Sequence, residues 1–144
     1  MATETETETL TVEDANRRLP LVRAIVQDAI GLKADVVARR ERLEDLRERY
    51  PDEDDDVSPY SEEVLEMQQS VLADEFRIDG FAEELEQVGA ELIDAETGLV
   101  EFASTLDGLP VRLSWLFDEP EVGFWRAEDD KPINRKPLEL TEAG

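Results

Sequence analysis

The chain has 144 residues, with 38 Asp and Glu against 15 Lys and Arg, no His and no Cys, so its formal net charge is -23. This charge repels nucleic-acid phosphates and anionic membranes, and we expect neither as a partner. The missing residue types exclude thiol nucleophiles, imidazole bases, disulfides and zinc or iron–sulfur sites. Without a secretory signal or a membrane-length apolar run, the sequence predicts a single-domain cytoplasmic protein. A salt-rich cytoplasm and an ordinary acidic protein both account for the charge.

The two ends of the chain have the composition of tails. Residues 1–9 alternate Thr and Glu, which predicts a disordered acidic tail, and residues 139–144 are expected to be flexible. The domain therefore covers residues 10–138. Its first helical signal is Thr11, a favourable N-cap, with Asp14 in a capping-box position. Because Pro20 disfavours helical geometry at the preceding residue, we expect a short helix over 12–18 and then a long helix with Pro20 in its first turn.

Two helices with heptad spacing are predicted next. In the first, apolar residues recur at alternating steps of three and four over 22–50, and Arg39 is the one charged exception. The second helix opens at Ser58-Pro59 and repeats the spacing over 64–88, with Asp74 as its one charged exception. This pattern predicts an antiparallel pair packed along a coiled-coil-like seam. In the register that pairs the apolar positions, Arg39 lies opposite Asp74, so we expect an ion pair between them.

After Gly89, which is placed to end the helix, the period changes to two and predicts an antiparallel meander. Four strands are expected, at Ala90–Asp94, Leu99–Ala103, Val111–Phe117 and Val122–Arg126. Alternation assigns the apolar face to Val100, Phe102, Val111, Leu113, Trp115, Phe117, Val122 and Phe124, and the second face to Glu101, Arg112, Ser114, Leu116 and Trp125. Residues 127–138 are expected to fold back on the sheet as an extension. The fold class is α+β, a long helical hairpin followed by a small antiparallel sheet.

Three stretches resemble a single family. They are LTVEDANRRLP (residues 10–20), LIDAETGLVEF (92–102) and WLFDEPEVGFWRAEDDKPINRKPL (115–138). They are similar, in turn, to the opening, the strand–turn–strand and the two Trp with a closing Arg-x-Pro of the prokaryotic domain of unknown function family 2203. The resemblance covers nearly the whole chain and implies no activity, substrate or cofactor. Where the family pattern usually has His after the second Trp, this chain has Arg126, so no role that depends on that histidine is expected.

An acidic loop joins the two helices. Counted from Asp52, acids fall at positions 1, 3, 5 and 12 (Asp52, Asp54, Asp56 and Glu63), as in an EF-hand loop. The position that needs Gly for a sharp turn is Val57, so we expect a solvated loop with at most weak divalent-cation association. No metal site and no cofactor are predicted.

The chain has no histidine that could activate a serine as a nucleophile, so the sequence favours a protein that is not an enzyme. The candidate ligand site is on the second face of the sheet, where positive charge and an aromatic ring occur together in a very acidic chain. Its residues are Glu101, Arg112, Glu119, Trp125, Arg126 and Arg135. The alternative is that Glu101 and Arg112 form a cross-strand ion pair and that the C-terminal extension covers Trp125.

Helix length predicts self-association. Helices of about 30 residues extend roughly 45 Å, whereas strands of about five residues span only some 17 Å, so the sheet should leave the loop end of the hairpin uncovered. That outer half carries a second apolar set: Val37, Leu65, Leu72 and Phe76. We expect a two-fold homodimer through this set, unless an end of the chain covers it. The two functions considered are thus a self-associating interaction module and a binder, or minor enzyme, for a small anionic or amphipathic ligand.

Overall fold

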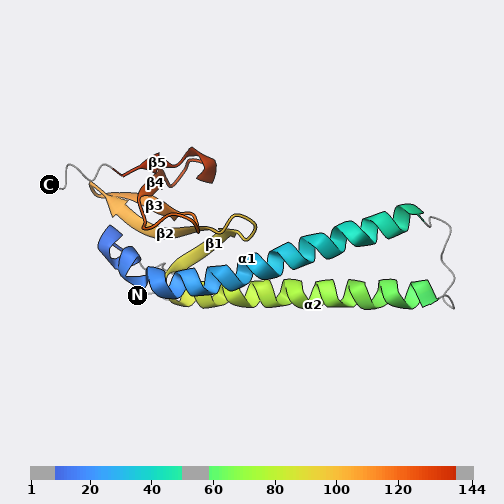
Figure 1. Cartoon of the computed structure of the whole chain (residues 1–144). Coiled ribbons are helices and arrows are strands. Elements are labelled where there is room, and N and C mark those ends of the chain that lie inside the picture. The colour runs from blue at the N-terminus through green and yellow to red at the C-terminus, as the bar shows by residue number, and fades with distance from the viewer. Residues whose placement is uncertain (1–8, 50–58, 139–144) are drawn as a thin grey trace, which may run out of the picture.

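The computed structural model describes residues 9–49 and 59–138, which form two long helices followed by an antiparallel sheet (Figure 1). Helix α1 spans Val12–Arg49 and helix α2 spans Pro59–Gln87. The sheet keeps its strands in chain order: β1 Ala90–Asp94, β2 Leu99–Leu106, β3 Leu109–Trp115, β4 Phe124–Ala127 and β5 Lys136–Pro137. The predicted α+β architecture is confirmed. The predicted tails, Thr9 apart, and most of the acidic loop lie outside the described residues.

Helix α1 begins where the sequence predicts. The backbone N–H of Asp14 donates to Thr11 Oγ1 at 3.0 Å, and the N–H of Thr11 donates to Asp14 Oδ2 at 3.2 Å, which is a reciprocal capping box. The expected separate helix over 12–18 is not seen, because α1 continues through Pro20. Proline removes a helical hydrogen bond, but burial of Ala15 and Leu19 on its N-terminal side holds the chain helical. Figure 1 shows these first turns inclined to the rest of α1, as a proline kink predicts.

The hairpin has the predicted register. Arg39 Nη2 donates to Asp74 Oδ2 at 2.6 Å, and Arg40 on the next position pairs with Glu75. The two charged exceptions to the heptad pattern therefore lie opposite each other.

Gly89 follows α2 with a φ of 83°, a left-handed conformation that glycine adopts without a Cβ penalty, and its N–H donates to the carbonyl of Glu86.

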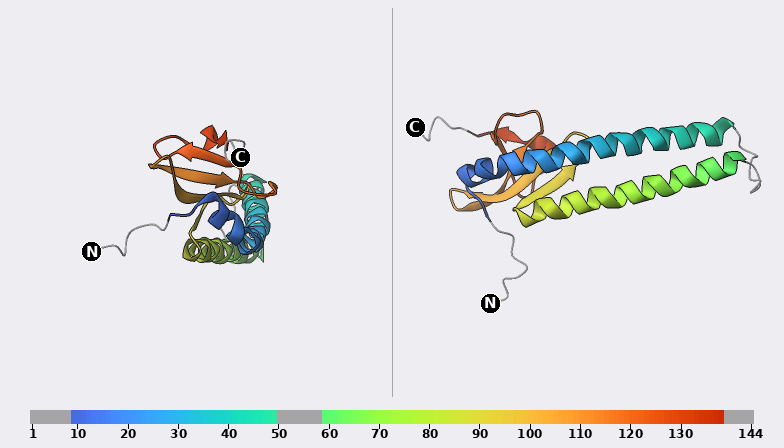
Figure 2. Two further views of the ribbon diagram at one scale, coloured as in Figure 1. Left: turned by 90° about the vertical axis from the view of Figure 1, so that its left-hand side faces the viewer. Right: turned by 60° about the horizontal axis from the view of Figure 1, so that its bottom comes forward.

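The core joins the inner ends of both helices to one face of the sheet, which lies on them as a second layer (Figure 2). Trp115, Phe102, Leu113 and Leu85 are among its fully buried side chains. Beyond Val36, no described residue of α1 is buried. The hairpin therefore extends well past the sheet, as its length predicts (Figure 1).

The hairpin of β2 and β3 extends farther toward its turn than predicted, and the turn itself is shorter. Asp107 and Gly108 have φ values of 54° and 81°, and Leu106 pairs directly with Leu109. Positive φ at both central residues is typical of a type I′ turn, which matches the twist of the flanking strands and for which Asp-Gly is a favoured sequence. The seven residues expected to connect the two strands (104–110) are thus reduced to a two-residue turn. The short strand β5 was also not predicted, because two residues carry no detectable alternation.

The faces of β4 are the reverse of the prediction. Trp125 lies opposite Leu113 and packs against the core, whereas Phe124 lies opposite Ser114 on the polar face. The prediction assumed that Val122 belongs to the strand. Val122 is instead buried in the preceding loop, where its N–H donates to Asn16 Oδ1 at 2.7 Å, so alternation restarts at Phe124.

Candidate functional site

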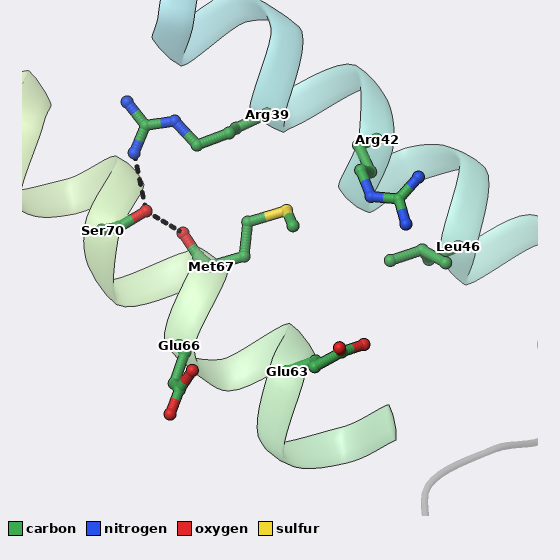
Figure 3. Close-up of a pocket in the computed structure, with 7 residues that line it drawn as sticks. All are labelled: Arg39, Arg42, Leu46, Glu63, Glu66, Met67 and Ser70. Atoms are coloured by element: carbon green, nitrogen blue, oxygen red, sulfur yellow. Dashed lines mark hydrogen bonds between the residues drawn. The ribbon is translucent and has the colours of Figure 1, made fainter. Parts of the chain in front are cut away.

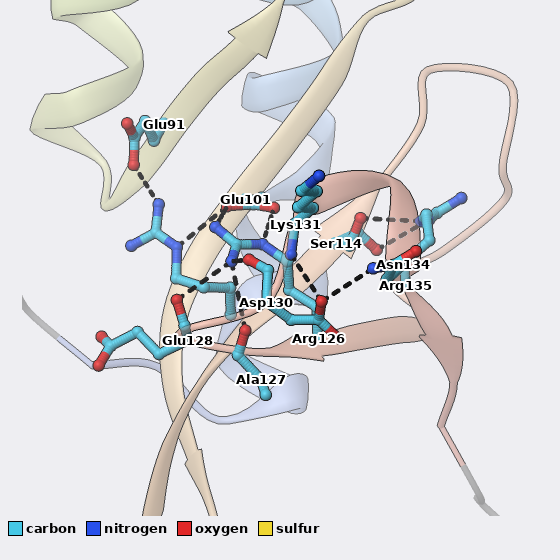
Figure 4. Close-up of polar contacts among 11 residues, drawn as sticks. Glu91, Glu101, Ser114, Arg126, Ala127, Glu128, Asp130, Lys131, Asn134 and Arg135 are labelled. Carbon is cyan, nitrogen blue, oxygen red and sulfur yellow. Dashed lines mark hydrogen bonds and ion pairs between the residues drawn. The ribbon is translucent and has the colours of Figure 1, made fainter.

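The polar face of the sheet holds a carboxylate between two arginines. Glu101 on β2 is fully buried and accepts hydrogen bonds from Arg112 Nε at 3.1 Å and from Arg126 Nε and Nη2 at 2.7 and 2.9 Å. The pairing of the strands explains this arrangement, because Arg112 on β3 lies opposite Arg126 on β4 and β2 is the adjacent strand. The Glu101–Arg112 ion pair of the alternative interpretation is present. Arg126 makes a second ion pair with Glu101 (Figure 4).

These contacts decide the charge state of the buried group. Burial raises the pKa of the Glu101 carboxyl, but hydrogen bonds and positive charge from Arg126 and Arg112 outweigh it, so the pKa lies below its ordinary value. The hydrogen bonds to Glu101 in turn raise the pKa of Arg126. Glu101 is therefore an ionised acceptor at neutral pH, and it is unsuited to act as a general acid.

Arg126 also organises the chain that follows it. Its Nη1 donates to the backbone carbonyls of Ala127, Glu128 and Asp130, so one guanidinium joins the sheet to the start of the extension (Figure 4). Asp130 then accepts from the N–H of Lys131 and from the side chain of Asn134. The donors of Arg126 are thus used within the chain.

A second arginine holds the extension against the same face. Arg135 Nη1 and Nη2 donate to the two carboxylate oxygens of Glu119 at 2.8 and 2.7 Å, and its Nε donates to Ser114 Oγ at 2.8 Å. Its guanidinium stacks 4.0 Å from the ring centroid of Phe124. Burial raises the pKa of Glu119, but the hydrogen bonds from Arg135 and from the Leu116 N–H lower it below its ordinary value. The expected folding back of residues 127–138 on the sheet is confirmed.

The six predicted ligand-site residues form two closed clusters and one separate residue. Glu101 groups with Arg112 and Arg126, Glu119 groups with Arg135, and Trp125 lies on the core side with the Lys136 ammonium 5.3 Å from its ring centroid. Every buried side-chain nitrogen or oxygen in the described part of the chain has a hydrogen-bond partner. This face is a satisfied polar network that holds the extension in place.

Three participants were not predicted: Glu91, Ser114 as a hydrogen-bond partner, and Phe124. Glu91 pairs with the outer side of Arg112, and it lies opposite Glu101 in the β1–β2 register. Alternation from the Asp-Gly turn places Ser114 beside Glu101, but Phe124 depended on the β4 register, which the sequence did not define.

Farther along the hairpin, the helices separate around an open cleft of about 400 Å³ beyond Arg39 (Figure 3). Its lining combines the ends of the seam with charged rims: Arg39, Arg42, Leu46, Glu63, Glu66, Met67 and Ser70. Arg39 donates to Ser70 Oγ at 2.6 Å, and a hydrogen bond from Arg39 is the main cause that lowers the pKa of Asp74. The described residues hold no cluster of acids able to bind a metal, and the EF-hand-like acids 52–56 lie outside them.

The predicted contact set is exposed on α2. Leu65, Leu72 and Phe76 expose 53%, 64% and 77% of their surface. Val37 on α1 is half-buried in a groove beside the β1–β2 turn. Three of the four residues therefore form one exposed apolar face on a single helix.

Comparison with known proteins gives one family. The family described as "Uncharacterized conserved protein (DUF2203)" matches residues 8–138, which is most of the chain. No curated protein and no solved structure matches the sequence or the fold. Within the described ranges, neither helix is both long and apolar enough to cross a membrane.

Proposed function

The chain belongs to the DUF2203 family, and we propose that it acts in the cytoplasm as a non-enzymatic interaction module that associates with a second copy of itself through the outer half of α2. The observation that carries this proposal is the exposed apolar face of α2, formed by Leu65, Leu72 and Phe76. Isolated apolar residues on a surface are ordinary, whereas several exposed apolar residues aligned on one helix face are typical of an interaction surface.

The spacing on α2 describes a second seam beside the one that faces α1. Leu65, Gln69, Leu72 and Phe76 are separated by four, three and four residues, the step of a coiled-coil contact, over roughly 16 Å of helix. All four are exposed and uncharged, in a chain whose net charge is -23. Two copies repel each other over most of their surfaces, but they can meet here without placing carboxylates face to face.

The seam is also limited at both ends. The next positions in the same spacing are Glu62 and Asp79, both exposed acids. Their repulsion in a pair of copies favours a short contact and makes association dependent on salt, because screening shortens the reach of exposed charges. The polar face of the sheet, by contrast, presents arginines that are already paired, so it supports the small-ligand function less well.

The test is light scattering of the full chain in about 0.3 M salt, where the Debye length is roughly 6 Å. We expect a dimer whose dissociation constant rises at least tenfold in Leu72→Asp. Leu109→Asp is the matched control, because Leu109 at the start of β3 exposes 66% of its surface against 64% for Leu72 and the substitution changes the charge identically. A monomer at every concentration, or equal weakening by both variants, would refute the proposed contact.

A further inference from the structure

A shallow groove of about 420 Å³ lies along α1 beside the turn between β1 and β2. One face of the helix forms its floor, and the turn forms its wall. Its lining residues are Ile30, Ala34, Val37, Ala38 and Glu41 from α1 and Glu96 from the turn. Gly98 brings the turn close to α1, since a Cβ there would lie 2.8 Å from Ile30 Cδ1 and 2.7 Å from Phe117 Cβ. The groove is therefore a defined product of how the sheet packs on the helix.

The charged groups of the groove have a single sign. Glu41 and Glu96 line it and no basic residue does. The arginines that precede Glu41 in the chain are directed to α2, where Arg39 pairs with Asp74 and Arg40 with Glu75. In the described part of the chain, neither Glu41 nor Glu96 makes an ion pair. An apolar floor between two unneutralised carboxylates is complementary to an apolar ligand surface flanked by cations.

We infer that this groove binds a basic amphipathic helix of a partner protein. The apolar floor residues 30, 34, 37 and 38 follow one helix face over about 12 Å, the length that a partner helix covers with apolar side chains at i, i+4 and i+7. Lys or Arg beside that stripe would face Glu41 and Glu96. The inference goes beyond the proposed self-association, because it concerns a different surface and a partner of opposite charge.

The probe is a labelled 14-residue Leu/Lys peptide with amphipathic helical patterning, and the readout is fluorescence anisotropy with the full chain at 0.15 M salt. We expect saturable binding that the double substitution Glu41→Lys with Glu96→Lys weakens at least tenfold, since two attractive contacts become repulsive. The matched control is Glu84→Lys with Glu86→Lys, because both residues are exposed on α2 and neither lines the groove. Both pairs shift the net charge equally, and we expect less than a threefold change from the control.

Two further variants separate this site from other surfaces. Val37→Asp places a charge on the floor and should also weaken the peptide at least tenfold, while Leu72→Asp should leave its affinity unchanged. Equal weakening by the two Glu→Lys pairs would mean general charge attraction and would overturn the groove. Loss of binding in Leu72→Asp would move the peptide to the α2 seam and would equally overturn it. Absence of any binding by the Leu/Lys peptide contradicts the inference directly.

Discussion

Replacement of Glu101 by Gln tests the polar network beneath the extension. The substitution removes a fully buried charge that accepts three hydrogen bonds and leaves Arg112 and Arg126, which are 15% and 11% exposed, facing a neutral amide. Breaking a buried ion pair from one side costs about 3–5 kcal/mol. Arg126 keeps its backbone carbonyls and Arg112 keeps Glu91, so we expect the lower end, about 3 kcal/mol.

The assay is urea unfolding at pH 7, followed by far-UV circular dichroism. With an m-value of about 1.5–2 kcal/mol/M, the midpoint of Glu101→Gln should fall by roughly 1.5–2 M. Glu91→Gln is the matched control, because it removes the same charge from the other side of Arg112, where the carboxylate is 55% exposed. We expect that control to cost less than about 1 kcal/mol. Equal midpoints for the two variants would refute the argument.

Three further outcomes are expected. Arg126 and Arg112 hold the pKa of Glu101 below its ordinary value, so the stabilisation by its carboxylate is complete above that ordinary value and is lost as pH falls through the folded-state pKa. The unfolding free energy of Glu101→Gln should therefore depend less on acid pH, as urea unfolding at several pH values would measure. A double-mutant cycle on Arg39 and Asp74 should give a larger coupling energy than one on the more exposed pair Arg49 and Asp45. Gly98→Ala should lower the unfolding free energy by more than about 2 kcal/mol, since the φ of residue 98 is 77° and the added Cβ would collide with Phe117 and Ile30. Gly80→Ala, in open space on α2, should instead raise the unfolding free energy by roughly 0.5–1 kcal/mol. Thermal denaturation of the two variants measures both effects.

Much of the helical half could be predicted because its signals are local and repeated. The heptad spacing defined both the seam and its register, and the structure confirms the ion pair that this register places between Arg39 and Asp74. The capping box at Thr11 and Asp14 marked where α1 starts. The helix break predicted at Pro20 is wrong, because burial of its neighbours in the core outweighs the local preference of proline against a helix interior.

The candidate site was harder, because its partners depend on strand register. Alternation within β2 and β3 placed Glu101 beside Arg112, and the structure confirms that pair. The position of Arg126 required the true start of β4, which follows a loop where Val122 makes a tertiary hydrogen bond to Asn16. A contact between residues so distant in the chain leaves no local pattern, so Trp125 was assigned to the wrong face.

Pulsed electron paramagnetic resonance of a spin label at position 69 tests most directly whether two copies meet through the outer face of α2. The chain has no native cysteine, so Gln69→Cys gives one label per copy. Packed helix axes lie about 8–10 Å apart, and we predict an interchain distance below about 30 Å that disappears on dilution with unlabelled chain. A label at Asp107→Cys, on the β2–β3 turn, should give no such short distance. No short distance at position 69, in a sample that light scattering shows to be dimeric, would contradict the account.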